Sequence, residues 1–247
     1  MLKEERLNYI IGQINIHNKV LSSDLSSQLK VSEDTIRRDL SELVDGGKIL
    51  KVHGGAISKS FHFPAVERDI YRQDAKKEIA RKALELIEEG MIVLVGGGTT
   101  MIELARIIPE KLKCTFFTVS PVVALELAEK ANLEVHLIAG RLSPSSQMII
   151  GSQVIAQLAE LHADLCFLGT NSISLEHGIT DSDWEVVQVK KAMIKSANET
   201  VILSISEKID SAQKMKVCDL NALKYMITDL DPKDAVLKHY SSKITLI

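Results

Sequence analysis

Four polar side chains between residues 32 and 38 have the types and the spacing to bind a nucleic acid: Ser32, Thr35, Arg37 and Arg38. Guanidinium and hydroxyl groups donate hydrogen bonds to base edges and to phosphate oxygens. At about 100° per residue, Arg38 points almost directly away from the apolar side of a helix, while Arg37 and Thr35 lie on opposite flanks. The spacing therefore predicts a helix that offers Arg38, rather than Arg37, to a base edge in the major groove.

The helix that must position these side chains spans the segment 31–47. Ser32 is a suitable N-cap because its hydroxyl accepts an otherwise unpaired backbone N–H, and Gly46 and Gly47 supply the stop. The apolar side consists of four residues at helical spacing, Ile36, Leu40, Leu43 and Val44. Taken alone, two arginines on a polar face are more often typical of an ordinary surface helix, so the neighbouring segments must decide between the two interpretations.

Those neighbours favour DNA binding. Helices are expected over 2–16 and about 22–30, and a tight turn joins the second to the segment 31–47, which is helix-turn-helix spacing. Two β-rich runs then flank Gly54 and Gly55 and predict a hairpin, or wing. The cations along it, Lys48, Lys51 and His53, suit DNA phosphates, whose contacts orient a protein while a helix reads the bases.

The overall charge gives no general attraction to nucleic acid. The net charge is -3, and residues 1–60 contain nine Lys or Arg against eight Asp or Glu. DNA binding would therefore depend on the local placement of cations and on dimerisation.

The cysteines and the N-terminal segment predict the compartment. Cys114, Cys166 and Cys218 form no CxxC pair, which indicates free thiols in a reducing cytosol rather than disulfides or a metal site. We therefore expect neither a metal nor a cofactor. The N-terminal segment has no apolar signal core, and no run approaches the roughly 18 apolar residues of a membrane span. A cytoplasmic protein without membrane contact is expected.

The 247 residues suffice for two domains, and helices and apolar strands alternate over 76–247. Residues 58–75 contain Pro64 and break the periodicity, so we expect a linker there between domains at 1–57 and 76–247. Strands are predicted at 91–95, 114–119, 134–139, 163–168, 200–204, 225–228 and 243–246, and helices at 76–89, 99–108, 121–131, 149–160 and 185–196. Apolar strands separated by helices indicate an α/β fold with a parallel sheet covered on both faces.

Ligands bind outside the carboxyl ends of the strands in such sheets, and small polar residues follow several of the predicted strands. The run 96–100, Gly-Gly-Gly-Thr-Thr, ends one strand and opens a helix, so its backbone N–H groups, helix dipole and hydroxyls suit a phosphate or another anion. Glycines there are nearly as often needed only for a tight turn, and the P-loop lysine is missing. The expected effector residues are Gly97, Gly98, Thr99, Thr100, Ser120, Gly140, Lys190 and Lys208.

Residues 31–40, followed by Gly-Lys-Ile at 47–49 and His-Gly-Gly-Ala at 53–56, resemble the N-terminal winged helix-turn-helix of the DeoR family of bacterial transcription regulators. The match covers about residues 3–57. The resemblance implies double-stranded operator DNA as the partner, with Ser32, Thr35, Arg37 and Arg38 in contact with it. To these we add Lys51 and His53 of the wing.

From about Arg72 to its end, the chain resembles the sugar-phosphate-sensing C-terminal domain of the same family, which is similar in fold to ribose-5-phosphate isomerase. Residues 98–100 match the family's phosphate loop, and Lys190, Met193 and Lys208 match later positions of its pattern. The resemblance implies a phosphorylated sugar as effector. The chain departs from the pattern where sugar hydroxyls or a catalytic base would be expected, at Gly96, Val119, Val186 and Ile205.

Two hypotheses from different classes follow. The first is a transcription regulator, a repressor of a sugar-utilisation operon, acting as a dimer or tetramer that places two winged helices on a palindrome. The second is an isomerase-like enzyme with an added N-terminal module, which would need a carboxylate base beside the anion site. Gly96, Val119 and Ile205 argue against the second, so we expect no catalytic residues. A purely structural oligomer would leave residues 31–55 unexplained.

Overall fold

The computed structural model describes residues 1–58 and 70–247, which belong to two compact units, Met1–Tyr71 and Arg72–Ile247. Most of the predicted linker, 58–75, lies outside the described residues, and its last part already belongs to a helix that begins at Gln73. Within the described ranges, no helix combines the length and the apolar character needed to cross a membrane.

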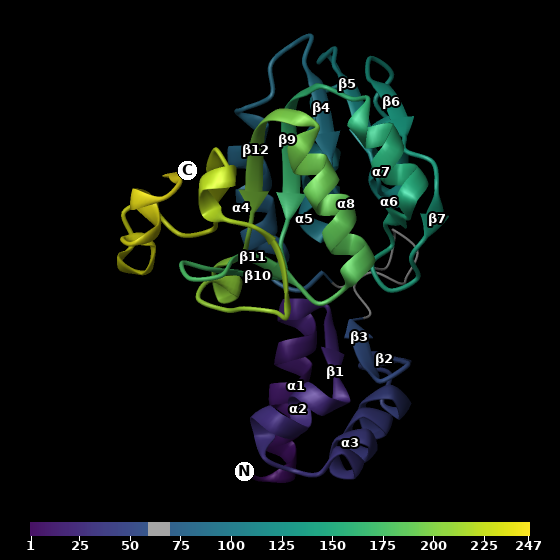
Figure 1. Cartoon of the computed structure of the whole chain (residues 1–247), viewed down its shortest axis with the longest axis vertical. Helices are drawn as coiled ribbons and strands as arrows, with labels where there is room; N and C mark the ends of the chain where they lie inside the picture. The colour runs from purple at the N-terminus through teal and green to yellow at the C-terminus, as the bar shows by residue number, and fades with distance from the viewer. Residues whose placement is uncertain (59–69) are drawn as a thin grey trace. The chain divides into compact units, whose positions relative to one another are not determined.

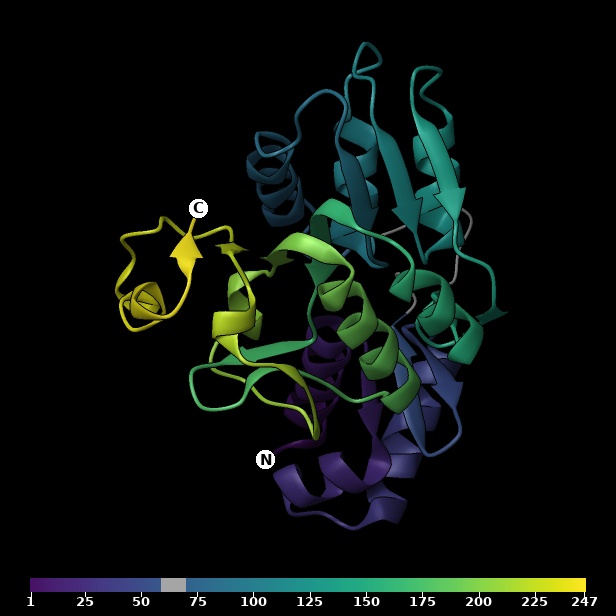
Figure 2. The same ribbon diagram turned by 45° about the horizontal axis from the view of Figure 1, so that its top comes forward.

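The first unit is a winged helix-turn-helix, as predicted (Figures 1 and 2). Its helices are α1 (Lys3–His17), α2 (Ser22–Leu29) and α3 (Glu33–Asp45), and its strands are β1 (Lys19–Leu21), β2 (Ile49–Val52) and β3 (Gly55–Ser58). The strands form an antiparallel sheet in the order β1-β3-β2. Both figures draw β2 and β3 as the blue hairpin of the wing.

Strand β1 was not predicted, because three residues are too few for an alternating pattern to be recognised. Val20 pairs with Ala56 of β3, and its neighbour Gly55 makes the approach possible. A Cβ at Gly55 would overlap the Val20 carbonyl oxygen, so a glycine is needed where these two strands meet.

A buried core and one buried ion pair hold α3 against α1. The core consists of fully buried apolar side chains from all three helices and the wing, among them Ile10, Ile14, Leu25, Ile36 and Ile49. Arg6 of α1 donates to both carboxylate oxygens of Asp39 on α3, at 2.6 and 3.1 Å. A bidentate pair of this kind restricts orientation as well as distance, so it sets the angle of α3 on its support.

The second unit contains the predicted parallel sheet, with seven strands in the order β15-β14-β12-β9-β4-β5-β6. Every neighbouring pair in it is parallel. The strands are β4 (Ile92–Val95), β5 (Thr115–Thr118), β6 (Glu134–Leu137), β9 (Ala163–Gly169), β12 (Ala197–Leu203), β14 (Tyr225–Ile227) and β15 (Thr245–Leu246).

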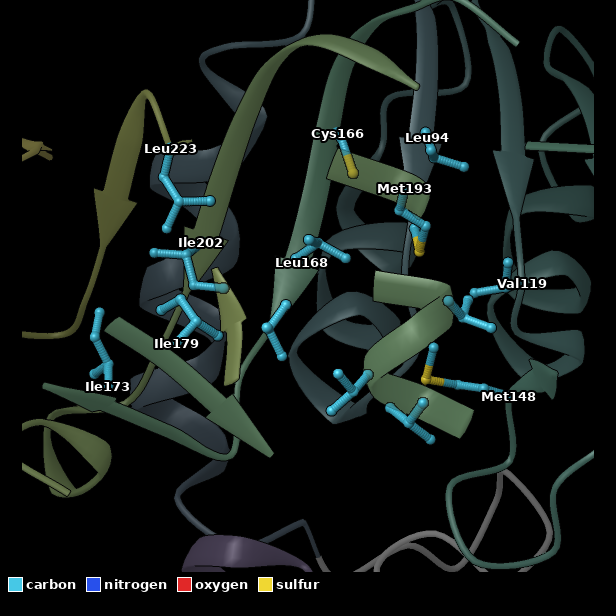
Figure 3. Close-up of a cluster of buried hydrophobic side chains, with 14 of the residues drawn as sticks. Leu94, Val119, Met148, Cys166, Leu168, Ile173, Ile179, Met193, Ile202 and Leu223 are labelled. Carbon is cyan, nitrogen blue, oxygen red and sulfur yellow. The ribbon is translucent and has the colours of Figure 1, made fainter. Parts of the chain in front are cut away.

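Helices cover both faces of this sheet. They are α4 (Gln73–Leu84), α5 (Thr99–Ile107), α6 (Pro121–Ala128), α7 (Ser152–Ala159) and α8 (Trp184–Lys195). Figure 1 shows α8 in front of β9 and β4, with α4 and α5 behind them. Figure 3 shows the apolar layer under α8, where Met193 lies beside Leu94, Cys166 and Leu168 of the central strands.

Two parts of this unit differ from the prediction. The segment 149–160 was expected to be helical throughout, but Ile149–Ile150 form strand β8, which pairs with β7 (Arg141–Leu142) before α7 begins. The second difference is a separate antiparallel sheet that was not predicted, made of β10 (Ser172–Ser174), β11 (Gly178–Asp181) and β13 (Met215–Cys218). Short apolar runs do not distinguish helix from strand, which accounts for the first error.

Candidate functional site

The start of α3 has the predicted cap. Ser32 Oγ accepts the backbone N–H of Thr35 at 3.2 Å and lies 2.9 Å from Thr35 Oγ1. The two hydroxyls therefore form one polar group at the exposed N-terminus of the helix. The predicted apolar side is buried, with Ile36, Leu40 and Leu43 at most 5% exposed.

The two arginines of α3 differ in the contacts that their guanidinium groups make. Arg37 forms ion pairs with Glu33 at 3.2 Å and Asp34 at 3.1 Å on its own helix. Arg38 is exposed, and in the described part of the chain no hydrogen bond or ion pair engages its guanidinium. Arg38 is thus available to an incoming partner without first losing a contact, in agreement with its place on the helical wheel.

The predicted wing residues are exposed on the hairpin. Lys51 lies on β2, and His53 lies in the turn between β2 and β3. Gly54 follows with φ of 75°, a conformation that favours glycine and keeps this turn tight. The wing therefore presents two basic side chains close together in the chain, the arrangement expected of a phosphate contact.

The second unit has its topological switch point between β4 and β9. From β4 the chain proceeds through β5 and β6 to one edge, and it returns to β9 on the other side of β4. The segments that follow β4 and β9 therefore lead away in different directions at the carboxyl ends of the strands, the place where open α/β sheets bind ligands, and we call this place the crevice. The first residue after β4 lies beside β9, since Gly96 N–H donates to the Phe167 carbonyl at 2.9 Å.

The predicted anion loop forms the N-terminus of α5. Gly98 is the N-cap with φ of 122°, and as a glycine it provides no side-chain cap. Because α5 begins soon after β4 ends, the positive end of its dipole, with the backbone amides of Thr99 and Thr100, lies near the carboxyl end of that strand. Thr99 is buried, whereas Thr100 is partly exposed.

Ser120 lies beside this loop. Its Cβ is 3.6 Å from the position that a Cβ on Gly97 would take, and its Oγ accepts Val123 N–H at 3.5 Å to cap α6. Gly140 is in a different setting: a Cβ there would lie 2.7 Å from Val154 and 2.8 Å from Ile149. Close packing of α7 and β8 thus accounts for the glycine at 140.

Lys190 of α8 is held by a residue that sequence reasoning missed. Its Nζ donates to Asp181 Oδ2 at 2.8 Å, and both side chains are buried. The other carboxylate oxygen accepts N–H groups of Ser182 at 2.7 Å and Asn171 at 2.9 Å. Burial alone would raise the pKa of Asp181, but the Lys190 charge and these hydrogen bonds hold it below its ordinary value.

Two further lysines complete a cluster with Lys190. Lys208 Nζ donates to the Thr170 carbonyl at 2.6 Å. Burial, and the repulsion of the Lys76 and Lys190 charges, lower the pKa of Lys208 to about 7. Burial likewise lowers the pKa of Lys76 to about 8, against the attraction of Glu207 and Glu103. We call Lys76, Lys190 and Lys208 the lysine cluster.

The lysine cluster and the glycine loop belong to one crevice. A Cβ on Gly169, the last residue of β9, would lie 3.5 Å from the Gly97 carbonyl oxygen, and the next carbonyl, of Thr170, is the one that holds Lys208. These distances place Gly97, Gly98, Thr99 and Thr100, with Ser120 beside them, at the end of the sheet that Lys208 reaches, and the Lys190 charge contributes to the lowered pKa of Lys208. Gly140 is not brought into contact with the others by any described interaction.

Lys76 could have been found from the sequence with one more step of reasoning, whereas Asp181 could not. Lys76 occupies the apolar side of α4 with Ile79, Ala80 and Ala83, and a lysine on a buried face requires an explanation. Asp181 ends β11, whose sheet was not predicted, so its position relative to Lys190 could not be derived. Among the described residues, no group of three His, Cys, Asp or Glu side chains could hold a metal ion.

The four positions that depart from the family pattern are filled by core side chains or by none. Val119, Val186 and Ile205 are at most 3% exposed and pack in the interior. A Cβ at Gly96 would contact Leu168 at 3.3 Å. The crevice therefore offers cations and backbone amides, while these four positions add no group that could bind a hydroxyl.

Two family models match the chain. The DeoR-like helix-turn-helix domain matches residues 6–61, and the DeoR C terminal sensor domain matches residues 71–230. The HTH-type transcriptional repressor GlcR of Bacillus subtilis is 32% identical over 95% of this chain and 92% of its own. The lactose phosphotransferase system repressor of Streptococcus mutans is also 32% identical, over 96% of each chain.

An activator is similar as well: the L-fucose operon activator of Escherichia coli is 29% identical over 92% of this chain and 96% of its own. Among solved structures, ribose 5-phosphate isomerase A of Methanocaldococcus jannaschii covers 56% of this chain and 55% of its own, with 20% identity and a TM-score of 0.41.

Proposed function

Because the chain belongs to the DeoR family of transcription regulators, we propose that it represses a sugar-utilisation operon under the control of a phosphorylated sugar or a related anion. Two of the similar proteins reported above are named as repressors, which supports repression over activation. The observation that carries the proposal for the effector is the surplus of buried positive charge in the crevice of the second unit.

The surplus follows from the way the carboxylates are paired. Among the described residues, Glu103 forms an ion pair with Arg106 at 3.2 Å, and Glu207 forms one with Arg72 at 2.6 Å. Lys190 is paired with Asp181, whereas the printed hydrogen bond of Lys208 goes to the uncharged Thr170 carbonyl, so the positive charge of Lys208 is the surplus. Burying unbalanced charge is costly, so the crevice favours a ligand that supplies the missing negative charge.

A phosphate monoester fits this requirement better than a carboxylate does. It carries close to two negative charges near pH 7, more than a carboxylate does, and its oxygens accept several hydrogen bonds. The amides at the start of α5 and the Thr99 and Thr100 hydroxyls supply donors of the required kind.

The isomerase alternative needs a carboxylate that can act as a base. A general base works best with a pKa near the operating pH and needs a free oxygen. Asp181, the carboxylate beside the lysine cluster, has both oxygens engaged and a lowered pKa. We therefore propose that the crevice binds an anion without turning it over.

In the first unit, we propose that Arg38 contacts a base edge, while Ser32, Thr35, Arg37, Lys51 and His53 contact the backbone of operator DNA. The free guanidinium of Arg38 and the exposed wing cations support this division. A homo-oligomer, a dimer or tetramer, would place two such units on the half-sites of a palindrome.

A thermal-shift screen tests the effector proposal. Sugar phosphates are compared one by one with the corresponding free sugars, which serve as matched uncharged controls. A ligand that binds only the folded chain, at about 100 times its Kd, should raise the Tm by about 5 °C or more. The proposal is supported if sugar phosphates raise the Tm, the free sugars do not, and the Lys208→Gln variant shows no such rise. Equal shifts with free sugars, or none across the phosphates, would overturn it.

A further inference from the structure

Asp34 is an acidic side chain on the face of α3 that is proposed to meet DNA. Its side chain is 78% exposed, and it lies one helical turn before Arg38. Residues four apart in a helix lie on the same side, so Asp34 and Arg38 both point away from the buried residues Ile36 and Leu40. Phosphates repel a carboxylate, so a negative charge on a DNA-reading face requires an explanation.

One oxygen of this carboxylate is already held. Arg37 donates from Nη1 to Asp34 Oδ1 at 3.1 Å, and its other terminal nitrogen donates to Glu33 at 3.2 Å. In the described part of the chain, no hydrogen bond engages Asp34 Oδ2. The Arg37 charge therefore offsets part of the repulsion from phosphates and restricts the carboxylate, while Oδ2 stays available as an acceptor.

The major groove offers few donors that such an acceptor can use. Cytosine presents its N4 amino group there, whereas guanine and thymine present acceptors. Adenine presents an N6 donor beside its N7 acceptor, and the N7 lone pair repels a carboxylate. A free carboxylate oxygen therefore selects cytosine, because beside another base its charge is left without a satisfactory partner.

We propose that Asp34 is a specificity-determining residue that accepts a hydrogen bond from the N4 amino group of a cytosine in the operator. The inference rests on the proposed DNA-binding function and adds a second base-reading side chain to Arg38. Four residues of helix rise by about 6 Å, and base pairs stack about 3.4 Å apart. On a helix that lies in the major groove, Asp34 therefore reads a base pair one or two steps from the guanine that suits Arg38.

The carboxylate contributes more by excluding other bases than by tightening the complex. Beside cytosine, the N4 hydrogen bond and the Arg37 charge compensate for its lost hydration. Beside guanine or thymine, its lone pairs face those of the base, so we expect such a mismatch to weaken binding about tenfold. Removal of the carboxylate should conversely raise the affinity for random duplex.

The experiment is a selection of binding sequences by the full-length chain from a library of randomised duplexes, followed by sequencing. The wild-type chain should enrich cytosine about tenfold over the other bases at one position of each half-site. Asp34→Asn should shift this preference to adenine, because an amide binds adenine N6 and N7 together. Asp34→Ala should lose the preference at that position and keep the guanine preference assigned to Arg38.

Glu33→Gln is the matched control. Glu33 lies in the same first turn and pairs with the same arginine, but the helical wheel places it closer to the apolar side than to Arg38. Its replacement changes the charge at the helix start and the Arg37 contacts, yet it should leave the cytosine preference unchanged. Thermal unfolding followed by circular dichroism establishes that each variant is folded, and these exposed substitutions should shift the Tm little.

The outcomes separate this inference from the proposed function. The inference is wrong if both Asp34 variants select the same bases as the wild-type chain, or if Glu33→Gln changes the preference as Asp34→Asn does. A uniform loss of preference at every position would also overturn it, since Asp34 would then act on the placement of α3. If the wild-type chain enriches no sequence from the library, DNA reading itself fails, and this inference with it.

Discussion

The two units handle charge in opposite ways. In the first, the cations proposed to bind DNA are exposed: the Arg37 side chain is 64% exposed, and its partners lie one turn away on the same helix. In the second, the Lys190 side chain is 8% exposed, and its partner Asp181 lies on a different element, strand β11, rather than on the same helix. The proposed DNA-binding surface keeps its cations exposed to water, whereas the proposed anion site gathers them in the interior.

This difference determines what each unit requires. Exposed charges cost little to hold, so α3 needs only a cap, an apolar side and a support. Buried like charges repel one another and lose hydration, so Lys190 and Lys208 depend on Asp181 and the Thr170 carbonyl, which accept their hydrogen bonds. The first property to test is therefore whether the stability that an ion pair contributes depends on its burial.

The largest expected effect is the loss of the buried pair. Asp181→Ala leaves the Lys190 charge without its partner and should lower the free energy of unfolding by about 3–5 kcal/mol. Glu33→Ala breaks an exposed pair of α3 and should cost at most about 1 kcal/mol. Urea denaturation of both variants gives the comparison, and similar losses would show that the two pairs do not differ as described.

The second test contrasts the two arginines of α3. Arg38→Ala should weaken specific DNA binding by about 1–3 kcal/mol, as expected for the loss of a bidentate base contact. Arg37→Ala should lower affinity for specific and random duplexes alike, because Arg37 is assigned to the backbone. Fluorescence anisotropy with both duplexes measures these affinities. If Arg38→Ala binds the operator as tightly as the wild-type chain does, the assignment of Arg38 to a base edge is wrong.

The pH dependence of anion binding tests the lysine cluster. Lys208 has a pKa of about 7, lowered by burial and by Lys76 and Lys190, and a bound anion favours its charged form. Affinity should therefore be retained at pH 6 and fall above about pH 7, by up to about tenfold per pH unit for each proton taken up. Sulfate is the probe, because its charge stays constant over this range. A pH-independent affinity, or the same slope in Lys208→Gln, would contradict the assignment.

The smallest effect is expected at the start of α5. Thr99→Val with Thr100→Val removes two hydroxyls but keeps the backbone amides, so each change should cost about 0.5–1.5 kcal/mol of effector binding. We expect the effector response to be lost at limiting concentrations while DNA affinity stays intact. If the effector changes DNA binding by the double variant as it does in the wild-type chain, the loop at the start of α5 does not bind the effector as proposed.

The sequence was informative where structure is local. The Ser32 cap, the apolar side of α3 and the wing depend on residues close together in the chain, and each was predicted. The parallel sheet was predicted because each of its strands is a recognisable apolar run between helices, although the strands pair over long distances in the chain. Strand β1 and the sheet of β10, β11 and β13 depend on pairing between distant short segments, and they were missed. Asp181 was missed for the same reason, because only that sheet brings it to Lys190.

The most direct test of the account is one anisotropy titration with a labelled duplex from the promoter beside the gene, in competition with random duplex at about 0.15 M salt. The chain should prefer the promoter by about 10³-fold or more. A sugar phosphate that raises the Tm should change that preference, and Lys208→Gln should not respond to it. Equal affinity for both duplexes, or a response that persists in Lys208→Gln, would contradict the account.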